Sequence, residues 1–170
     1  MKIQTDTRAW FCQQVEEHHV SLYRLARSLL KNEADAQDAV QDAVLTAYEK
    51  LGTLRSQEKF RPWIMRIVVN TAYDMLRQRR DTAQIEHATG LIAPDGRDPG
   101  ELLSLRDALL QLSPELRAVI VLFYYEGLSV REISGVLGAS QGAVKTRLCR
   151  ARQQLRGLLT DEGESSNEGF

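Results

Sequence analysis

The 170-residue chain contains only two cysteines, the residues that form the disulfides and many of the metal sites of small secreted or metal-binding domains. Its two cysteines, Cys12 and Cys149, lie far apart in the sequence and in no metal-ligand spacing, so we expect free thiols rather than a disulfide or a zinc site. No apolar run is long enough to span a bilayer, and the N-terminal residues contain no signal-peptide core. These absences predict a cytoplasmic protein with no membrane insertion of its own.

Sequence motifs of small-molecule chemistry are missing as well. The chain has no Gly-rich phosphate loop and no nucleophile elbow. Asp35, Asp38 and Asp42 lie close together on one helical stretch, but no histidine or further carboxylate is placed to complete a metal site with them. We therefore expect no catalytic residues, no metal and no cofactor.

Charge is present in both signs, and its distribution is uneven although the net charge is only −1. Lys and Arg outnumber Asp and Glu by 13 to 10 in residues 1–80 and by 8 to 4 in residues 105–160. Acidic residues outnumber basic ones by 5 to 1 in residues 81–104 and by 4 to 0 in residues 161–170. The overall charge alone would argue against a nucleic-acid partner. The two mildly basic blocks, residues 1–80 and 105–160, are compatible with one.

Residues 128–159 have the pattern of a helix-turn-helix. Ser129 and Glu132 have capping-box spacing at the start of the first helix, and Ser140 can cap the second helix after a three-residue turn. The second helix has an apolar stripe, and it carries hydroxyl and cationic side chains around the rest of its circumference. Such a helix can enter a major groove, with base edges at its first turns and phosphates at its later arginines. A solvated amphipathic helix is the alternative, and the short turn before so basic a helix favours DNA binding.

The predicted helix 34–51 has small residues on one side and a mixed face on the other. That face contains Asp38, Gln41, Asp42, Leu45 and Glu49. An exposed leucine among carboxylates suits the docking of a basic partner. Acidic helix faces are also commonly just solvated, and this pattern alone leaves both interpretations open.

The predicted helix 61–80 combines aromatic, amide and cationic side chains. Trp63 lies at its start, and its outward face contains Arg66, Asn70, Tyr73, Arg77 and Arg80. Aromatic rings stack on bases, an amide can read a base edge and arginines bind phosphates, a combination that suits single-stranded DNA. Alternatively, Trp63 and Tyr73 belong to the core or its rim and the arginines are solvated. We expect Trp63 to be partly core in either case.

The expected fold is all-α, with two small helical domains joined by a flexible linker. Residues 81–104 lose helical periodicity and gain glycine and proline, which predicts the linker. The domains are residues 1–80 and residues 105–160, the second of which contains the helix-turn-helix. Residues 161–170 are polar and acidic and predict a disordered tail.

Four stretches in this order resemble bacterial sigma factors of the extracytoplasmic-function (ECF) group, the minimal sigma-70-type proteins. They are DAQDAVQDAVLTAYEKL (35–51), FRPWIMRIVVNTAYDMLRQRR (60–80), LRDALLQLSPELRAVIVLFYYEGLSVREIS (105–134) and VKTRLCRARQQL (144–155). The resemblance covers both predicted domains and leaves out the linker and the tail. The sequence departs from the family at Ser134, where alanine is frequent, and at Cys149, where a bulky residue is common.

The resemblance implies an alternative sigma factor whose domains 1–80 and 105–160 correspond to the family's regions 2 and 4. Its partners would be core RNA polymerase, through the clamp and flap regions, promoter DNA and an anti-sigma factor. Helix 35–51 would dock on the clamp, which gives the acidic face a role.

The resemblance also implies two promoter contacts. Helix 60–80 and loop 52–59 would open the −10 element and hold its non-template strand, with a pocket in the loop beside Asn70 and Trp63. Extruding a base costs a few kcal/mol, which stacking and hydrogen bonding there would offset. The duplex −35 element would be read by Ser140, Gln141, Lys145, Thr146, Arg147 and Arg150.

The alternative function is an autonomous helix-turn-helix regulator that binds an operator. Such a protein needs a ligand pocket or a dimer seam in its first domain, whereas this chain has an acidic helix beside an aromatic and basic one. A pure protein-interaction adaptor would leave Lys145, Arg147 and Arg150 without a role.

Overall fold

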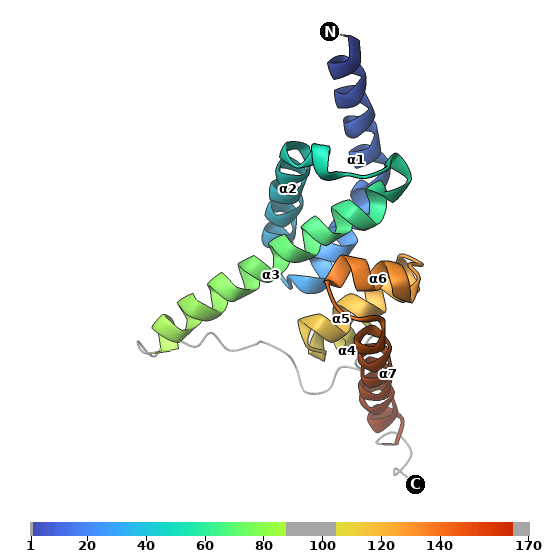
Figure 1. The fold of residues 1–170 in the computed structure, drawn as a ribbon. Coiled ribbons are helices and arrows are strands. Elements are labelled where there is room, and N and C mark those ends of the chain that lie inside the picture. The colour runs from blue at the N-terminus through green and yellow to red at the C-terminus, as the bar shows by residue number, and fades with distance from the viewer. Residues whose placement is uncertain (1, 88–104, 165–170) are drawn as a thin grey trace.

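The computed structural model describes residues 2–87 and 105–164, and every regular element in these two ranges is helical. The first region, residues 2–87, contains α1 (Lys2–Leu29), α2 (Glu33–Glu49), η1 (Leu51–Thr53), η2 (Gln57–Lys59) and α3 (Phe60–His87). The second region, residues 105–164, contains α4 (Leu105–Gln111), α5 (Pro114–Ile120), the π-helical turn η3 (Val121–Tyr125), α6 (Val130–Leu137) and α7 (Gln141–Glu164) (Figure 1). The predicted all-α fold with two helical regions is confirmed.

The helices begin where local capping chemistry places them. The Asn32 side chain accepts hydrogen bonds from the backbone N–H groups of Ala34 and Asp35 at the start of α2. Ser129 and Glu132 form the predicted capping box of α6, and Ser140 accepts from the N–H of Ala143 in α7.

Two helices extend further than predicted. α3 continues to His87, so the first residues of the predicted linker 81–104 are helical, while residues 88–104 lie outside the described ranges. No glycine or proline interrupts the sequence between residue 80 and Gly90, which explains why the helix does not stop at 80. α7 reaches Glu164, and residues 165–170 of the predicted tail lie outside the described ranges. None of the helices in the described ranges is long and apolar enough to cross a membrane.

The first region is a three-helix unit. The buried stripe of α2 is mostly alanine, and these small side chains let α2 pack closely against α1 and α3. The Phe60 ring is almost fully buried at the start of α3 and makes edge contacts with Trp10 and Phe11 of α1. The sides of α2 and α3 that face away from the core of this unit therefore point outward from it.

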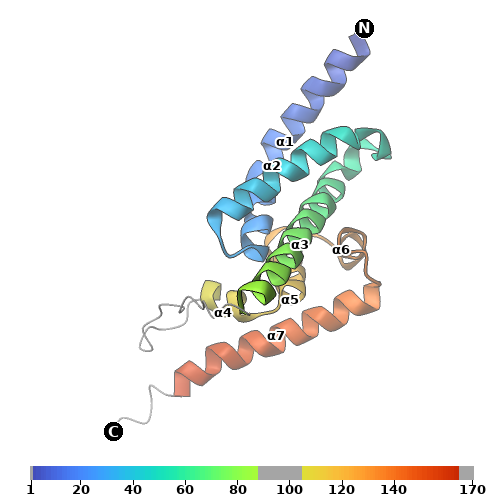
Figure 2. The ribbon, with the colours of Figure 1, turned by 90° about the vertical axis from the view of Figure 1, so that its left-hand side faces the viewer.

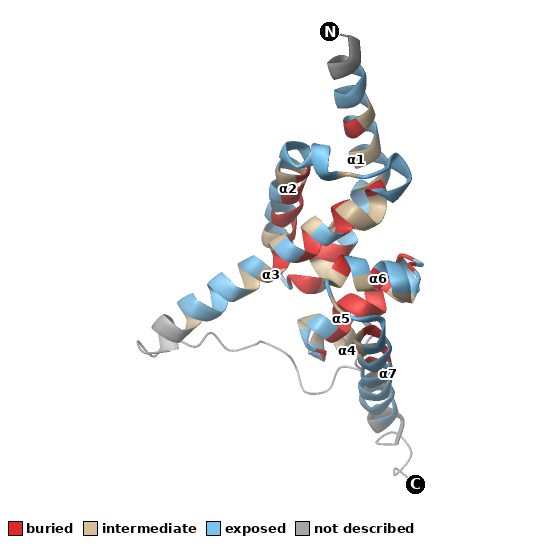
Figure 3. Cartoon of the chain, viewed as in Figure 1, coloured by how far each residue is buried: buried red, intermediate tan, exposed pale blue. Residues whose placement is uncertain are grey.

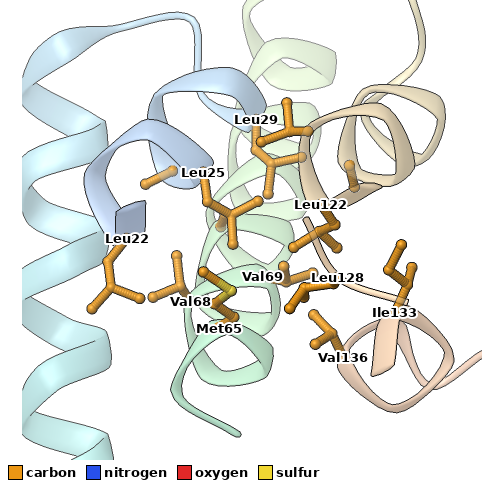
Figure 4. Close-up of a cluster of buried hydrophobic side chains, with 14 of the residues drawn as sticks. Leu22, Leu25, Leu29, Met65, Val68, Val69, Leu122, Leu128, Ile133 and Val136 are labelled. Atoms are coloured by element: carbon orange, nitrogen blue, oxygen red, sulfur yellow. The ribbon is translucent and has the colours of Figure 1, made fainter. Parts of the chain in front are cut away.

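The two regions pack against each other through what we call the junction. α3 lies against α6, and α1 lies against α5 and η3. Buried side chains gather where these helices meet (Figure 3). Figure 4 shows the apolar side chains of this cluster, which come from both regions: Leu22, Leu25, Leu29, Met65, Val68, Val69, Leu122, Leu128, Ile133 and Val136. The two regions thus share one core, a feature that the predicted pair of helical domains joined by a flexible linker did not include.

Candidate nucleic-acid interface

The helix-turn-helix is formed by α6, a short turn and α7. Gly138 adopts a left-handed conformation with φ of +62°, which ends α6 and turns the chain toward α7. Val144, Leu148 and Ala151 of α7 are buried, as the apolar stripe of this helix predicted. α7 runs along one side of the molecule, as the view in Figure 2 shows.

Five of the six predicted duplex-reading residues are exposed on α7 and at its N-terminal turn. The exposed ones are Ser140, Gln141, Lys145, Thr146 and Arg150. Arg147 is half-buried and lies near enough to α3 for its charge to act on the Tyr73 hydroxyl. Arg152, further along, donates from Nε to the Tyr124 hydroxyl over 2.6 Å, so this arginine is engaged within the second region.

The predicted strand-binding residues on α3 have different environments. Arg66, Asn70, Arg77 and Arg80 are exposed. Trp63 is half-buried and packs against Phe60 with 5.9 Å between ring centroids, so it is partly core as expected.

Tyr73 does not lie on an open outward face; it is partly buried, which agrees with the alternative that it belongs to the core or its rim. Its ring packs against the shared core, and its buried hydroxyl has no hydrogen-bond partner among the described residues. Burial, followed by the nearby Glu115 carboxylate, raises the pKa of Tyr73 to about 12. The reason is the junction: the second region covers this part of α3, which helical periodicity within one segment does not reveal.

A groove of about 540 Å³ lies between the first region and α6. Residues of the predicted loop 52–59 line one wall together with Trp63 and Arg66, and Arg131 and Glu132 of α6 belong to the other wall. Asn70 is not part of this lining. The structure therefore places the loop beside Trp63, as predicted, but α6 contributes to the same groove.

The mixed face of α2 is open. Its predicted residues are all exposed: Asp38, Gln41, Asp42, Leu45 and Glu49. Leu45 is 65% exposed, which is high for an apolar residue in the middle of a helix. No other described helix covers this side of α2 in Figures 1 and 2.

Two charged residues buried at the junction were not predicted from the sequence. Glu126, directly after η3, has a side chain only 1% exposed and pairs with Arg24 of α1 and Arg61 of α3. Arg117 of α5 is buried and donates to the backbone oxygen of Leu29 in α1. Burial lowers the pKa of Arg117. No local pattern marks these residues, because their partners in the first region lie 65 to 102 positions away in the sequence.

Comparisons with known proteins cover both regions. Residues 14–82 match the family model for sigma-70 region 2, and residues 102–155 match the model for sigma-70 region 4. The RNA polymerase sigma factor SigV of Bacillus subtilis is 33% identical over 163 residues, which cover 95% of this chain and 98% of SigV. The ECF RNA polymerase sigma factor SigM of Mycobacterium tuberculosis is 36% identical over 88% of this chain and 76% of SigM.

Two solved structures are similar to the fold. The sigma factor RpoE from Bartonella quintana, in complex with the anti-sigma factor NepR, has a TM-score of 0.75 and 27% identity and covers 88% of this chain and 96% of RpoE. CnrH, in complex with the cytosolic domain of CnrY, has a TM-score of 0.68 and 34% identity and covers 91% of this chain and 90% of CnrH. Matches of this extent span both helical regions.

Proposed function

The chain belongs to the sigma-70 family as an ECF RNA polymerase sigma factor that directs promoter-specific transcription initiation, and from this premise we propose how its surfaces divide that work. The chain itself performs no catalysis and leaves RNA synthesis to the polymerase. The observation that supports this division is the separation of three exposed surfaces on one chain: the mixed face of α2, the outward side of α3 and the N-terminal half of α7.

The mixed face of α2 docks on core RNA polymerase. Leu45 supplies apolar area that binding removes from water, and Asp38, Asp42 and Glu49 steer and orient a basic surface. The partner surface is the clamp of the polymerase, and the second region contacts the flap. Because the α2 face takes no part in the packing of the described residues, substitutions on it test docking without disturbing the fold.

The outward side of α3 and the loop before it hold the melted −10 element. Trp63 offers a ring for stacking, Asn70 offers an amide for a base edge, and the arginines Arg66, Arg77 and Arg80 bind the strand's phosphates. Arg77 already pairs with Asp74 on the same exposed side, and this pair opens when phosphate competes for the guanidinium.

The N-terminal half of α7 reads the duplex −35 element. Ser140, Gln141 and Thr146 reach base edges from the first turns, and Lys145, Arg147 and Arg150 contact phosphates and nearby bases. Sequence selection then comes from two sites on one chain, which the polymerase holds at the spacing of the promoter.

An anti-sigma factor regulates the protein in the cytoplasm. A groove of about 370 Å³ between α1 and the α4–η3 segment is lined by apolar and aromatic side chains together with arginines, among them Val20, Tyr23, Leu109, Tyr125, Arg24, Arg27 and Arg106. An apolar groove that also contains arginines fits an amphipathic helix that carries acidic side chains. Since both regions line it, a protein bound there stabilises their packed arrangement.

In vitro transcription tests the proposed function. Purified chain is added to sigma-free bacterial core polymerase with a genomic promoter library, and start sites are sequenced. We expect new transcripts that share two upstream elements. Asp42→Arg reverses charge on the α2 face and should abolish them, whereas Glu16→Arg makes the same change on an exposed position of α1 and should not. Specific duplex binding by the chain alone, without any transcripts, would favour the autonomous regulator.

A further inference from the structure

We propose that Arg152 of α7 is a positioning residue for the reading of the duplex −35 element: held by Phe123 and Tyr124, it fixes how α7 is oriented and does not bind a DNA phosphate. The inference rests on the proposed reading role of the N-terminal half of α7. It separates Arg152 from Arg150, a residue of the same charge two positions earlier on the same helix.

Three contacts hold the Arg152 guanidinium, and we call them the clamp. Its Nε donates to the Tyr124 hydroxyl over 2.6 Å. Its central carbon lies 5.5 Å from the centroid of the Tyr124 ring and 5.8 Å from that of Phe123, within the range at which an aromatic ring attracts a cation. The two rings contact each other edge to face, with their centroids 5.0 Å apart. One side chain of α7 is thus held by two residues of η3.

The clamp lies at the edge of an apolar contact between α7 and the α5–η3 segment. Phe123 is half-buried and Tyr124 is 55% exposed, so both rings can be reached from α7. On α7, Ala151 is fully buried directly before Arg152, and Leu155 lines the same apolar groove as Tyr124. Apolar packing therefore holds α7 against this segment, and Arg152 adds a directional contact beside it.

Arg152 differs from other cations of α7 in what it contacts. In the described ranges, no ion pair or side-chain hydrogen bond engages Lys145 or Arg150, and both side chains are exposed. A helix turns by about 100° per residue, so Arg150 and Arg152 point about 160° apart. Lys145 shares the flank of Arg152 but lies about two turns nearer the N-terminus of α7. Binding of a phosphate by Arg152 would have to break the clamp.

The orientation of α7 matters more for base contacts than for phosphate contacts. Hydrogen bonds to base edges are directional, and the residues that make them must be held within roughly 0.5 Å of the productive geometry. Arg152 follows the reading residues on one continuous helix, so the clamp limits the rotation of that helix against η3. Phosphate contacts through exposed, flexible side chains tolerate a small rotation. Loss of the clamp should therefore lower sequence specificity and leave the salt dependence of binding unchanged.

Duplex binding by the full chain tests the proposal. The full chain in complex with core polymerase first enriches a duplex from a random library, and a scrambled duplex serves as the reference. The ratio of the two affinities measures specificity, and affinities over a series of salt concentrations report the number of phosphate contacts. Partial unfolding lowers binding to both duplexes alike, so a merely structural role of Arg152 does not change the ratio.

We expect Arg152→Gln and Arg152→Lys each to lower the ratio about two- to fivefold, the range that corresponds to one exposed cation–π contact, with no change in the salt slope. Tyr124→Phe keeps the ring but removes the hydroxyl acceptor, and it should lower the ratio in the same direction although Tyr124 is not on α7. It also gives the test if Arg152→Gln folds poorly by circular dichroism. Arg156→Lys is the matched control, because Arg156 is exposed on the same flank of α7 and makes no ring contact within the described ranges. Its ratio should be unchanged.

A phosphate contact by Arg152 predicts the opposite pattern. Arg152→Gln would then weaken binding to both duplexes alike and lower the salt slope by about one, and Arg152→Lys would restore binding. That pattern, an unchanged ratio in Arg152→Gln, or an equal loss in Arg156→Lys overturns the proposal. A lower ratio in Arg152→Gln without any change in Tyr124→Phe indicates a direct base contact and overturns it as well. Failure of the proposed function looks different: no duplex is enriched at all, which removes the reading role of α7 and this proposal with it.

Discussion

The exposed leucine on α2 provides a quantitative test of polymerase docking. Leu45 is 65% exposed, and fully burying a leucine side chain is worth about 1.5–3 kcal/mol. Burial of the exposed part at an interface is then worth about 1–2 kcal/mol, and alanine keeps a fraction of this. We expect Leu45→Ala to weaken binding to core RNA polymerase by about 1–1.4 kcal/mol, which is about a five- to tenfold rise in Kd.

The assay is competition of unlabelled variants against labelled chain for core polymerase, followed by fluorescence anisotropy. Val20→Ala is the matched control, because Val20 is 67% exposed but lies on α1, away from the α2 face. Thermal unfolding of Leu45→Ala should match that of the unmodified chain, since the side chain makes little contact within the fold. Equal affinities for Leu45→Ala and the unmodified chain, or an equal loss in Val20→Ala, would refute docking through α2.

Three further predictions address the DNA contacts and the helix-turn-helix. Arg150→Ala should weaken promoter binding by the polymerase complex and reduce the slope of log affinity against log salt by about one, as expected for one lost phosphate contact; an unchanged slope would argue against that contact. Asn70→Ala should impair promoter opening more than initial binding, and normal permanganate reactivity at the −10 element would count against it. Ser129→Ala should cost about 1 kcal/mol of unfolding free energy in a urea titration at pH 7, because it removes a helix cap. Hydrogen bonds from Ser129 hold the pKa of Glu132 below its usual 4.5, so this stabilisation is present above pH 4.5 and is lost as the pH falls through the lowered value. Protonation of Glu132 also weakens its bond from the Ser129 hydroxyl, so the difference between the unmodified chain and Ser129→Ala should narrow in acid, and a gap that stays constant would contradict that hydroxyl–carboxylate bond.

Features that depend on neighbours within a few residues could be predicted from the sequence. The caps at Asn32 and Ser129 and the buried stripe of α7 all follow from spacings of two to four residues, and the structure has each of them. The exposure of the mixed face of α2 follows in the same way, because its opposite side is a continuous stripe of small apolar residues. Interactions between residues close in the sequence determine these features, so a single sequence is enough to predict them.

The junction could not be predicted in this way, for a physical reason that α3 illustrates. Ile64 and Val68 are buried on one side of α3, and the adjacent Met65 and Val69 are buried as well, so α3 is covered from two sides. A run of apolar residues indicates burial without saying by what. The sequence likewise marks Glu126 as an ordinary charged residue at a helix end, and only the approach of Arg24 and Arg61 from distant segments explains why it is buried.

The unequal exposure of the surfaces implies an order of events on the polymerase. The mixed face of α2 is exposed while the two regions are packed together, so the proposed docking on the polymerase does not require the regions to separate. Trp63, on the proposed strand-binding side of α3, is half-buried and lines the groove shared with α6, so we expect separation of the regions to favour strand capture. A partner that holds the two regions apart must supply the free energy of separation, which includes exposing the apolar side chains of Val69, Leu128 and Ile133. Contacts of both regions with the polymerase can supply it, because each region then buries another surface in exchange. On the proposed division of surfaces, we therefore expect the chain alone to bind single-stranded DNA more weakly than the polymerase-bound chain does.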